Sequence, residues 1–292
     1  MRKSGIAIAM AAALAFAACG SSGPSQSAPT TPVKNGRAVV LTSVVKTAAA
    51  DSAKVSIDMS FDGFGAGLNM SADGAIDFAS GDSDITMEFG GGGILGSLLP
   101  PDVEARRVDG TTYVHMPVGL PSGKEWIAVP SGSAGSGSNT ALGIGNSTSP
   151  TKILAYLEKV SNGVKEVGTE TVRGVETTHY TAEVDLGKAV DGADVPHALR
   201  DEVGKVAGDI GTVPVDIYID GDGLLRREKL EMNFGSFFSG VGGASGAAGS
   251  GSTVTMQLDL YDFGSPVNVE APPADQVTTF GAGEISSNNA AA

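Results

Sequence analysis

Cys19 is the residue whose chemistry the surrounding sequence defines most sharply. It is the only cysteine in the chain and it follows two alanines. Ahead of it, Arg2 and Lys3 are positive, and residues 6–16 are apolar but too few to span a bilayer, which is the pattern of an export signal. We therefore expect residues 1–18 to be a signal peptide and Cys19 to carry a lipid anchor of diacylglycerol and palmitate.

An ordinary secretory signal cut after Ala18 is the alternative, with Cys19 left as an incidental free thiol. Phe16 is an imperfect match to a lipidation motif, because an aliphatic residue is more usual at that position. An exported chain with one unpaired thiol nevertheless makes more sense if acylation consumes the sulfur. The single cysteine also excludes internal disulfides and CxxC sites for a metal or a redox reaction.

The remaining residues of catalytic type form no known catalytic pattern. The sequence contains no G-x-S-x-G, H-E-x-x-H or G-x-x-x-x-G-K-[ST] motif, and the G-x-G-x-x-G match at 91–96 runs into prolines where a phosphate-binding helix would begin. His115, His179 and His197 lie far apart, and we expect the two strand histidines to be surface or half-buried residues. We predict no enzymatic activity, no metal and no cofactor, since a hydrolase would need a triad or a metal site.

Other charged residues are expected to play ordinary structural roles. Asp220 and Asp222 lie in an Asp-Gly-Asp-Gly segment that predicts a hairpin turn, because the further acidic positions of a calcium-binding loop are missing. Six more are interpreted as solvated strand charges: Glu183, Asp185, Arg226, Arg227, Glu228 and Glu231.

The charge balance excludes two classes of partner. The chain has 33 acidic and 19 basic residues, and loss of the signal with Arg2 and Lys3 takes the formal net charge from −14 to −16. Nucleic acid requires a basic footprint, and so does electrostatic docking on anionic lipid. Membrane attachment is therefore expected to come from the acyl chains alone.

The elements that must position these residues are strands. Apolar and polar residues alternate in 212–220, 253–261 and 55–61, and a period of two places all the apolar residues on one face of a sheet. One wet and one apolar face is typical of an antiparallel sheet. Further strands are predicted at 72–80, 84–90, 104–108, 112–116, 125–129, 164–172, 175–185 and 224–234.

Three segments predict helices, at 37–50, 150–160 and 196–207, because each has apolar residues at helical spacing. The second begins with Ser149 as a plausible N-cap and Pro150 at the first helical position. Three helices are too few to cover both sides of so long a sheet. We predict an α+β fold, a curved antiparallel β half-barrel of about eleven strands with helices packed over its concave face.

The chain is expected to hold one folded domain, residues 36–280. Residues 19–35 predict a flexible tether and residues 281–292 a disordered tail. Gly/Ser-rich insertions interrupt the strands, and two of them contain bulky apolar residues. These residues either tuck into the edge of the core, or they form the lips of a cavity or touch the bilayer beside the anchor. These residues are Ile94, Leu95, Leu98, Leu99, Phe237 and Phe238.

Four sequence stretches and the order of the elements resemble one superfamily of lipoproteins. The stretches are KEWIAV at 124–129, GVETTHY at 174–180, VDIYIDGDGLLRR at 215–227 and YDFGSPV at 261–267. They are similar to the superfamily that contains the localisation factors LolA and LolB and the mycobacterial lipoproteins LppX and LprG, over about residues 36–273. The resemblance implies a half-barrel closed by helices around an apolar cavity for acyl chains or lipidated proteins. The Gly/Ser insertions are longer than the family leads us to expect, and no residue marks a particular lipid.

The residues themselves also favour a carrier. Helices that cover the apolar concave face only partly leave a gap for acyl chains, worth about 0.8 kcal/mol per buried CH₂, whereas full cover gives an ordinary core. Methionines suit the gap because flexible thioethers adapt to variable ligands. The predicted lining consists of Val55, Ile57, Met59, Ile76, Phe78, Met87, Phe89, Ile217, Met232, Met256 and Leu258.

We therefore expect an exported monomer, anchored to the outer face of the cell membrane through Cys19, that binds lipid or lipoprotein cargo and no nucleic acid. The alternative is a lipoprotein sensor or interaction module. In that hypothesis the core is filled, and the acidic surface meets a membrane protein partner.

Overall fold

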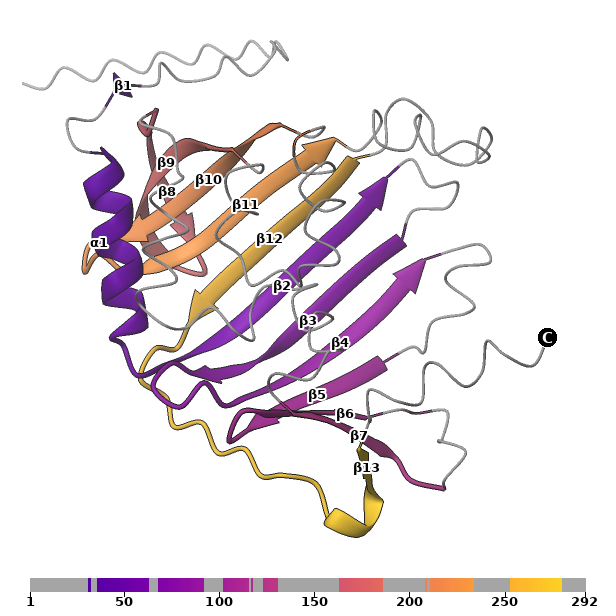
Figure 1. Cartoon of the computed structure of the whole chain (residues 1–292). Coiled ribbons are helices and arrows are strands. Elements are labelled where there is room, and N and C mark those ends of the chain that lie inside the picture. The colour runs from indigo at the N-terminus through magenta and orange to yellow at the C-terminus, as the bar shows by residue number, and fades with distance from the viewer. Residues whose placement is uncertain are drawn as a thin grey trace, which may run out of the picture.

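In the computed structural model of the chain, the described residues form one sheet of thirteen strands (Figure 1). The structure describes residues 31–32, 36–62, 68–91, 102–115, 117, 123–130, 163–185, 208, 211–233 and 253–279. Across the sheet the order is β1-β8-β9-β10-β11-β12-β2-β3-β4-β5-β6-β7-β13. Every neighbouring pair is antiparallel except β7 and β13, which are parallel.

The strands and helices have the following bounds. They are β1 (Thr31–Pro32), α1 (Gly36–Ala48), β2 (Ser52–Asp62), β3 (Leu68–Asp77), β4 (Ser83–Gly91), β5 (Asp102–Val108), β6 (Thr111–His115), β7 (Trp126–Pro130), β8 (Lys165–Val172), β9 (Val175–Asp185), β10 (Thr212–Asp220), β11 (Leu225–Asn233), β12 (Thr253–Tyr261), the 3₁₀ helix η2 (Ala274–Gln276) and β13 (Val277–Thr279).

The predicted antiparallel sheet is confirmed, and each of the eleven predicted strands has its counterpart among β2 to β12. The short edge strands β1 and β13 were not predicted, and β1 lies within the expected tether. The helix predicted at 37–50 is α1. The helices predicted at 150–160 and 196–207 lie outside the described residues, as do Cys19, His197 and the six apolar residues predicted to form cavity lips.

Local sequence determines the tight connections between strands. Asp109 and Gly110 join β5 to β6, and Arg173 and Gly174 join β8 to β9, in each case with positive φ at both residues, as two-residue hairpin turns require. Asp220 closes the connection from β10 to β11, because its Oδ1 accepts hydrogen bonds from the backbone N–H groups of residues 222 and 224. The turn predicted at 220–223 is therefore confirmed.

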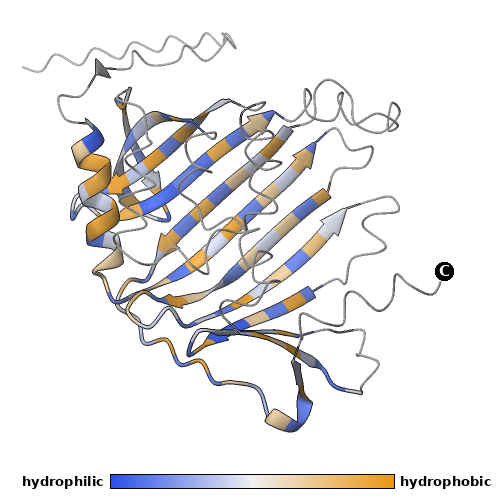
Figure 2. Ribbon diagram, viewed as in Figure 1, coloured by the Kyte–Doolittle hydropathy of each residue, from blue (hydrophilic) through white to orange (hydrophobic). Residues whose placement is uncertain are grey.

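Register then gathers the apolar residues on one face of the sheet. Apolar and polar residues alternate along the strands (Figure 2), and directly paired residues point to the same side. Met59 of β2, for example, pairs with Met256 of β12 and with Met70 of β3. The intervening Asp58 and Ser60 pair with polar residues and point to the opposite side.

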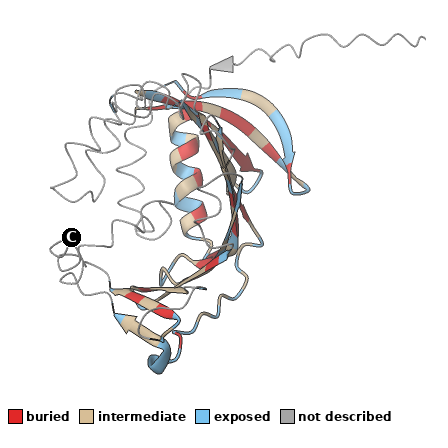
Figure 3. Cartoon of the chain, turned by 90° about the vertical axis from the view of Figure 1, so that its right-hand side faces the viewer, coloured by how far each residue is buried: buried red, intermediate tan, exposed pale blue. Residues whose placement is uncertain are grey.

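The sheet is strongly curved, and α1 lies on its inner side (Figure 3). Val40 of α1 is 3% exposed and packs with buried residues of β9 and β10 such as Tyr180, Val215 and Ile217. A second cluster around Val55 and Ile57 occupies the same face over β2, β3, β4 and β12. The face that bears α1 is therefore both concave and apolar, and we call it the concave face.

Gly74 provides a test of how closely β3 and β4 pack. A Cβ at this position would meet the carbonyl oxygen of Asp84 and lie 2.8 Å from Cα of Ile85. We expect Gly74→Ala to lower the free energy of unfolding by about 1–3 kcal/mol, because the added methyl forces the two backbones apart. Urea denaturation followed by circular dichroism measures this change.

Gly90→Ala is the matched control, because nothing lies within 4 Å of its added methyl. Its denaturation midpoint should equal or slightly exceed that of the wild type. Equal stabilities for the two variants would show that β3 and β4 are not packed as described.

Candidate functional site

The concave face brings the predicted lining residues together in cross-strand rows. One row consists of directly paired apolar residues from β9 to β4: Ala182, Val215, Leu230, Met256, Met59, Met70 and Phe89. From β11 to β4 this row crosses four interstrand spacings, roughly 19 Å. That is a continuous apolar surface long enough for an acyl chain.

A second row runs parallel to the first. On each strand it is offset by two residues, towards the C-terminal end of α1. It consists of Tyr180, Ile217, Glu228, Leu258, Ile57, Ala72, Met87 and Val103. Val55 and Ile76 lie in the same apolar cluster, and Phe78 packs against it. Met232 pairs with Val254 on the concave side of β11. All eleven predicted lining residues are thus associated with this face.

Burial varies across the concave face in a regular way. Val55 and Ile57 are 0% and 2% exposed and form the packed floor of the sheet. By contrast Met59, Met87 and Met256 are only half-buried, although they lie on the same face. These three methionines are therefore less tightly covered than Val55 and Ile57, and space for a ligand is expected beside them.

Three of the six residues predicted to be solvated strand charges are not solvated: Arg226 and Arg227 form ion pairs with the buried carboxylates of Asp220 and Asp259, both at 2.6 Å, and Glu228 lies on the concave face. Glu228 pairs with Ile217 on β10 and Leu258 on β12, both on the concave face. It is half-buried, and burial raises the pKa of its carboxyl. The alternation along β11 could have revealed this position. Residues two apart in a strand point to the same face, so Glu228 shares a face with Leu230 and Met232.

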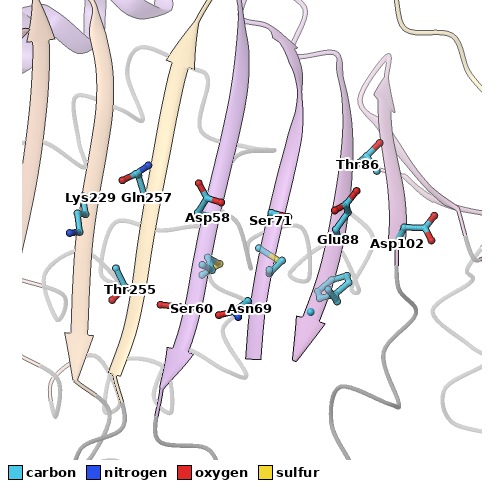
Figure 4. Close-up of a pocket in the computed structure, with 14 residues that line it drawn as sticks. Asp58, Ser60, Asn69, Ser71, Thr86, Glu88, Asp102, Lys229, Thr255 and Gln257 are labelled. Carbon is cyan, nitrogen blue, oxygen red and sulfur yellow. The ribbon is translucent and has the colours of Figure 1, made fainter. Parts of the chain in front are cut away.

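The opposite, convex face is polar and contains an open groove of about 960 Å³ (Figure 4). Its polar side chains come from the six strands β11, β12, β2, β3, β4 and β5. Asp58, Glu88 and Asp102 give it an acidic character, with Lys229 at one side. Met59, Met70 and Phe89 also contribute to the lining of this groove, so it combines polar and apolar atoms.

Arginine–carboxylate pairs hold the convex face together next to this groove. Asp259 is 2% exposed and accepts hydrogen bonds from Arg227 (Nε to Oδ1 2.6 Å, Nη2 to Oδ2 2.7 Å) and from Arg173 Nε (2.9 Å). Burial alone would raise the pKa of Asp259, but these hydrogen bonds outweigh it and hold the pKa below its usual value. Arg173 also lies over the ring of Tyr261, 4.2 Å from its centre.

His179 lies in the same polar layer and differs from its expected exposure. It is 8% exposed, with Nε2 3.0 Å from Asp216 and Nδ1 3.2 Å from Glu170. Its ring stacks on Tyr218 at 4.3 Å. Burial, together with Glu170 and Asp216, raises the pKa of Tyr218 to about 12. These contacts indicate that His179 has a structural role on the convex face.

His115 and the remaining polar groups add no reactive centre to the described part of the chain. His115 lies 4.0 Å from Glu125 and 5.0 Å from the Trp126 ring. Among the described residues, no three His, Cys, Asp or Glu side chains gather as a metal site. Of the helices described, none is both long and apolar enough to cross a bilayer.

Three comparisons place the chain among known proteins. No protein-family model matches it. It is 30% identical over 255 residues to the uncharacterised 31.2 kDa protein encoded between rplA and rplJ in Streptomyces griseus, covering 80% of this chain and 76% of that protein. The fold is similar to LprF from Mycobacterium bovis (14% identity, 83% of this chain, 99% of that one, TM-score 0.49). It is also similar to the Mycobacterium tuberculosis lipoprotein LppX (17% identity, 80% of this chain, 99% of that one, TM-score 0.46), a protein that the sequence motifs resemble.

The Asp259 network predicts a pH-dependent contribution to stability. We expect Asp259→Asn to lower the free energy of unfolding at neutral pH by about 3 kcal/mol, because two guanidinium groups lose a buried carboxylate. A carboxyl whose pKa is lower in the folded than in the unfolded chain stabilises the fold at every pH above its unfolded-state pKa. This stabilisation is lost as the pH falls through the folded-state pKa. The difference between wild type and variant should therefore shrink in acid, as measured by denaturation at a series of pH values.

Asp262→Asn is the control for that experiment. Asp262 pairs with Lys54 at 2.7 Å, but both side chains are about half exposed. Its loss should change stability little at any pH. If the two variants behave alike, Asp259 is not the buried centre of the network.

Proposed function

The chain belongs to the same family as the 31.2 kDa protein of Streptomyces griseus, and we propose that it is a membrane-anchored lipoprotein that binds an acyl-chain ligand on its concave face. The observation that carries the proposal is the continuous apolar surface formed by the paired rows of β11, β12, β2, β3 and β4. Helix α1 packs at one end of this surface, over β9, β10 and β11. The proposed binding surface lies beyond α1.

Burial of apolar atoms supplies the affinity in this proposal. Each methylene group of an acyl chain that leaves water contributes about 0.8 kcal/mol, so a chain that follows one row gains several kcal/mol. Half-buried Met59, Met87 and Met256 line these rows, and thioether side chains adapt to ligands of different shape. The protein acts by binding, without a catalytic step.

Cys19 is the proposed site of attachment to the outer face of the cell membrane. Eleven residues separate it from Thr31, where the sheet begins at β1. Fully extended, such a segment reaches roughly 40 Å, so the sheet would stay within about one bilayer thickness of the membrane surface. The six apolar residues at 94–99 and 237–238 remain candidates for cavity lips or membrane contacts.

A second candidate function rests on the convex groove. In this case the protein is an interaction module, and the polar groove with Asp58, Glu88 and Asp102 meets a membrane protein partner. The packed floor around Val55 and Ile57 is compatible with it, because those residues are already buried. The two candidate functions differ in which face of the same strands binds the partner: the concave face binds an acyl chain, or the convex face binds a protein.

Neighbouring residues of β12 allow the two faces to be tested separately. We expect Met256→Trp to reduce binding of a fluorescent fatty acid at least about tenfold, because the indole fills the space between Met256 and Met59. Gln257→Trp places the same side chain on the convex face and should leave binding unchanged. Equilibrium titration of the mature chain with Cys19→Ser, which avoids competition from its own lipid, measures both.

The alternative makes the opposite prediction for this pair. Loss of activity in cells with Gln257→Trp but not with Met256→Trp would replace the acyl-ligand proposal by the interaction module. Circular dichroism of both variants establishes that each is folded.

Cys19→Ser tests the anchor itself. We expect the wild-type protein in the membrane fraction, with the mass of its N-terminal peptide increased by the lipid, and the Cys19→Ser protein in the soluble exported fraction. The physical reason is that two or more acyl chains are needed for stable attachment and the acidic chain offers no electrostatic substitute. A Cys19→Ser protein that stays with the membrane would refute anchoring through this residue.

A further inference from the structure

Glu228 lies at the boundary between the two apolar clusters of the concave face. Its partner on β10, Ile217, belongs to the cluster beneath α1, and its partner on β12, Leu258, packs against the cluster of β2, β3 and β4. The next residue of β11 on this face is Leu230, which packs against the first cluster. Glu228 therefore stands where the surface covered by α1 meets the proposed binding surface.

No hydrogen bond or ion pair among the described residues involves the Glu228 carboxyl. Its partners in register are aliphatic, and burial is the cause that raises its pKa. A half-buried carboxyl between aliphatic neighbours loses part of its hydration without gaining a protein partner, which is unfavourable for folding, and ionisable groups in such surroundings concentrate at functional sites. Replacement by leucine would continue the row, so packing gives no reason for glutamate at this position.

We infer that Glu228 binds the head group of the acyl ligand and selects neutral heads that carry a hydroxyl group. This inference rests on the proposed function, because it assigns the polar end of the same site. The acyl chain would lie along the methionine rows of β12, β2, β3 and β4, with its head beside α1. The ligand class is then a hydroxyl-bearing acyl lipid such as a monoacylglycerol or a diacylglycerol.

The chemistry of a carboxyl in apolar surroundings explains the selection. A hydroxyl donates a hydrogen bond to the carboxyl oxygen, whether or not the carboxyl is ionised, and it accepts one when the carboxyl is protonated. A head that ends in carboxylate or phosphate would bring a second negative group against Glu228, and the acyl chain beside it would displace water that now screens the carboxyl. Acyl ligands of equal chain length should therefore differ in affinity according to their head groups alone.

The test measures competition between heads on the same chain. Monopalmitoylglycerol, palmitate, hexadecyl phosphate and hexadecylamine each displace a fluorescent fatty acid from the mature Cys19→Ser protein. We expect monopalmitoylglycerol to bind at least tenfold more tightly than palmitate or hexadecyl phosphate, a difference of about 1.4 kcal/mol. Hexadecylamine is included because an ammonium group would pair with an ionised carboxylate.

Two substitutions and a matched control assign the preference to Glu228. Glu228→Leu should abolish the difference between the heads, and Glu228→Gln should keep the affinity for monopalmitoylglycerol while raising that for palmitate, because the amide still hydrogen bonds but has no charge. Glu231→Gln removes a charge from the exposed, convex side of the same strand and should change nothing. Each variant keeps the shape of the strand, and thermal denaturation checks that it is folded.

Several outcomes would overturn the inference. Equal affinities of the wild type for monopalmitoylglycerol and palmitate, or a preference that survives in Glu228→Leu, would show that Glu228 does not read the head group while leaving acyl binding intact. Tighter binding of hexadecylamine that is lost in Glu228→Gln would make the site one for cations. Absence of displacement by all four probes would refute the proposed function together with this inference.

Discussion

All nine residues of β12 pair with β2, and this pairing joins the two halves of the sheet. The strands lie almost two hundred residues apart in the chain, yet their register places Met256 beside Met59 and Leu258 beside Ile57. Because side chains alternate with a period of two, a slip of one residue would turn the apolar set of β12 to the opposite face. The apolar rows, the curvature around them and the proposed ligand surface all depend on this register.

Separation of the two faces gives each a different physical role. The concave face excludes charge except at a few positions, so burial of apolar surface dominates there. The convex face concentrates the ion pairs, with Asp259 held between Arg227 and Arg173, and it also contains the polar groove. Sheet stability can therefore come from the convex network and the packed floor, and in the proposed function the half-buried methionines then contact the ligand.

Strict alternation made most of this architecture predictable. Segments such as 253–261 reveal both a strand and its buried face, and the predicted lining residues do lie together. Glu228 was misplaced because residue type was given more weight than phase, although Leu230 and Met232 show which face it occupies. The pair of Arg173 and Asp259 joins a turn to a distant strand, and β13 lies parallel to β7 with only three residues, so neither leaves a local signal. How far the methionine rows are covered depends on how the sheet bends, which no single segment encodes.

Location of the acyl chain is the most direct test of the central claim that the concave face is the binding surface. A crystal structure of the mature chain with a fatty acid brominated near its terminal carbon would show the bromine by anomalous scattering. We predict the peak over the row of Met256, Met59 and Met70, on the side of the sheet that bears α1. A peak in the convex groove beside Asp58, or an interior with no bound chain at saturating ligand, would contradict the account.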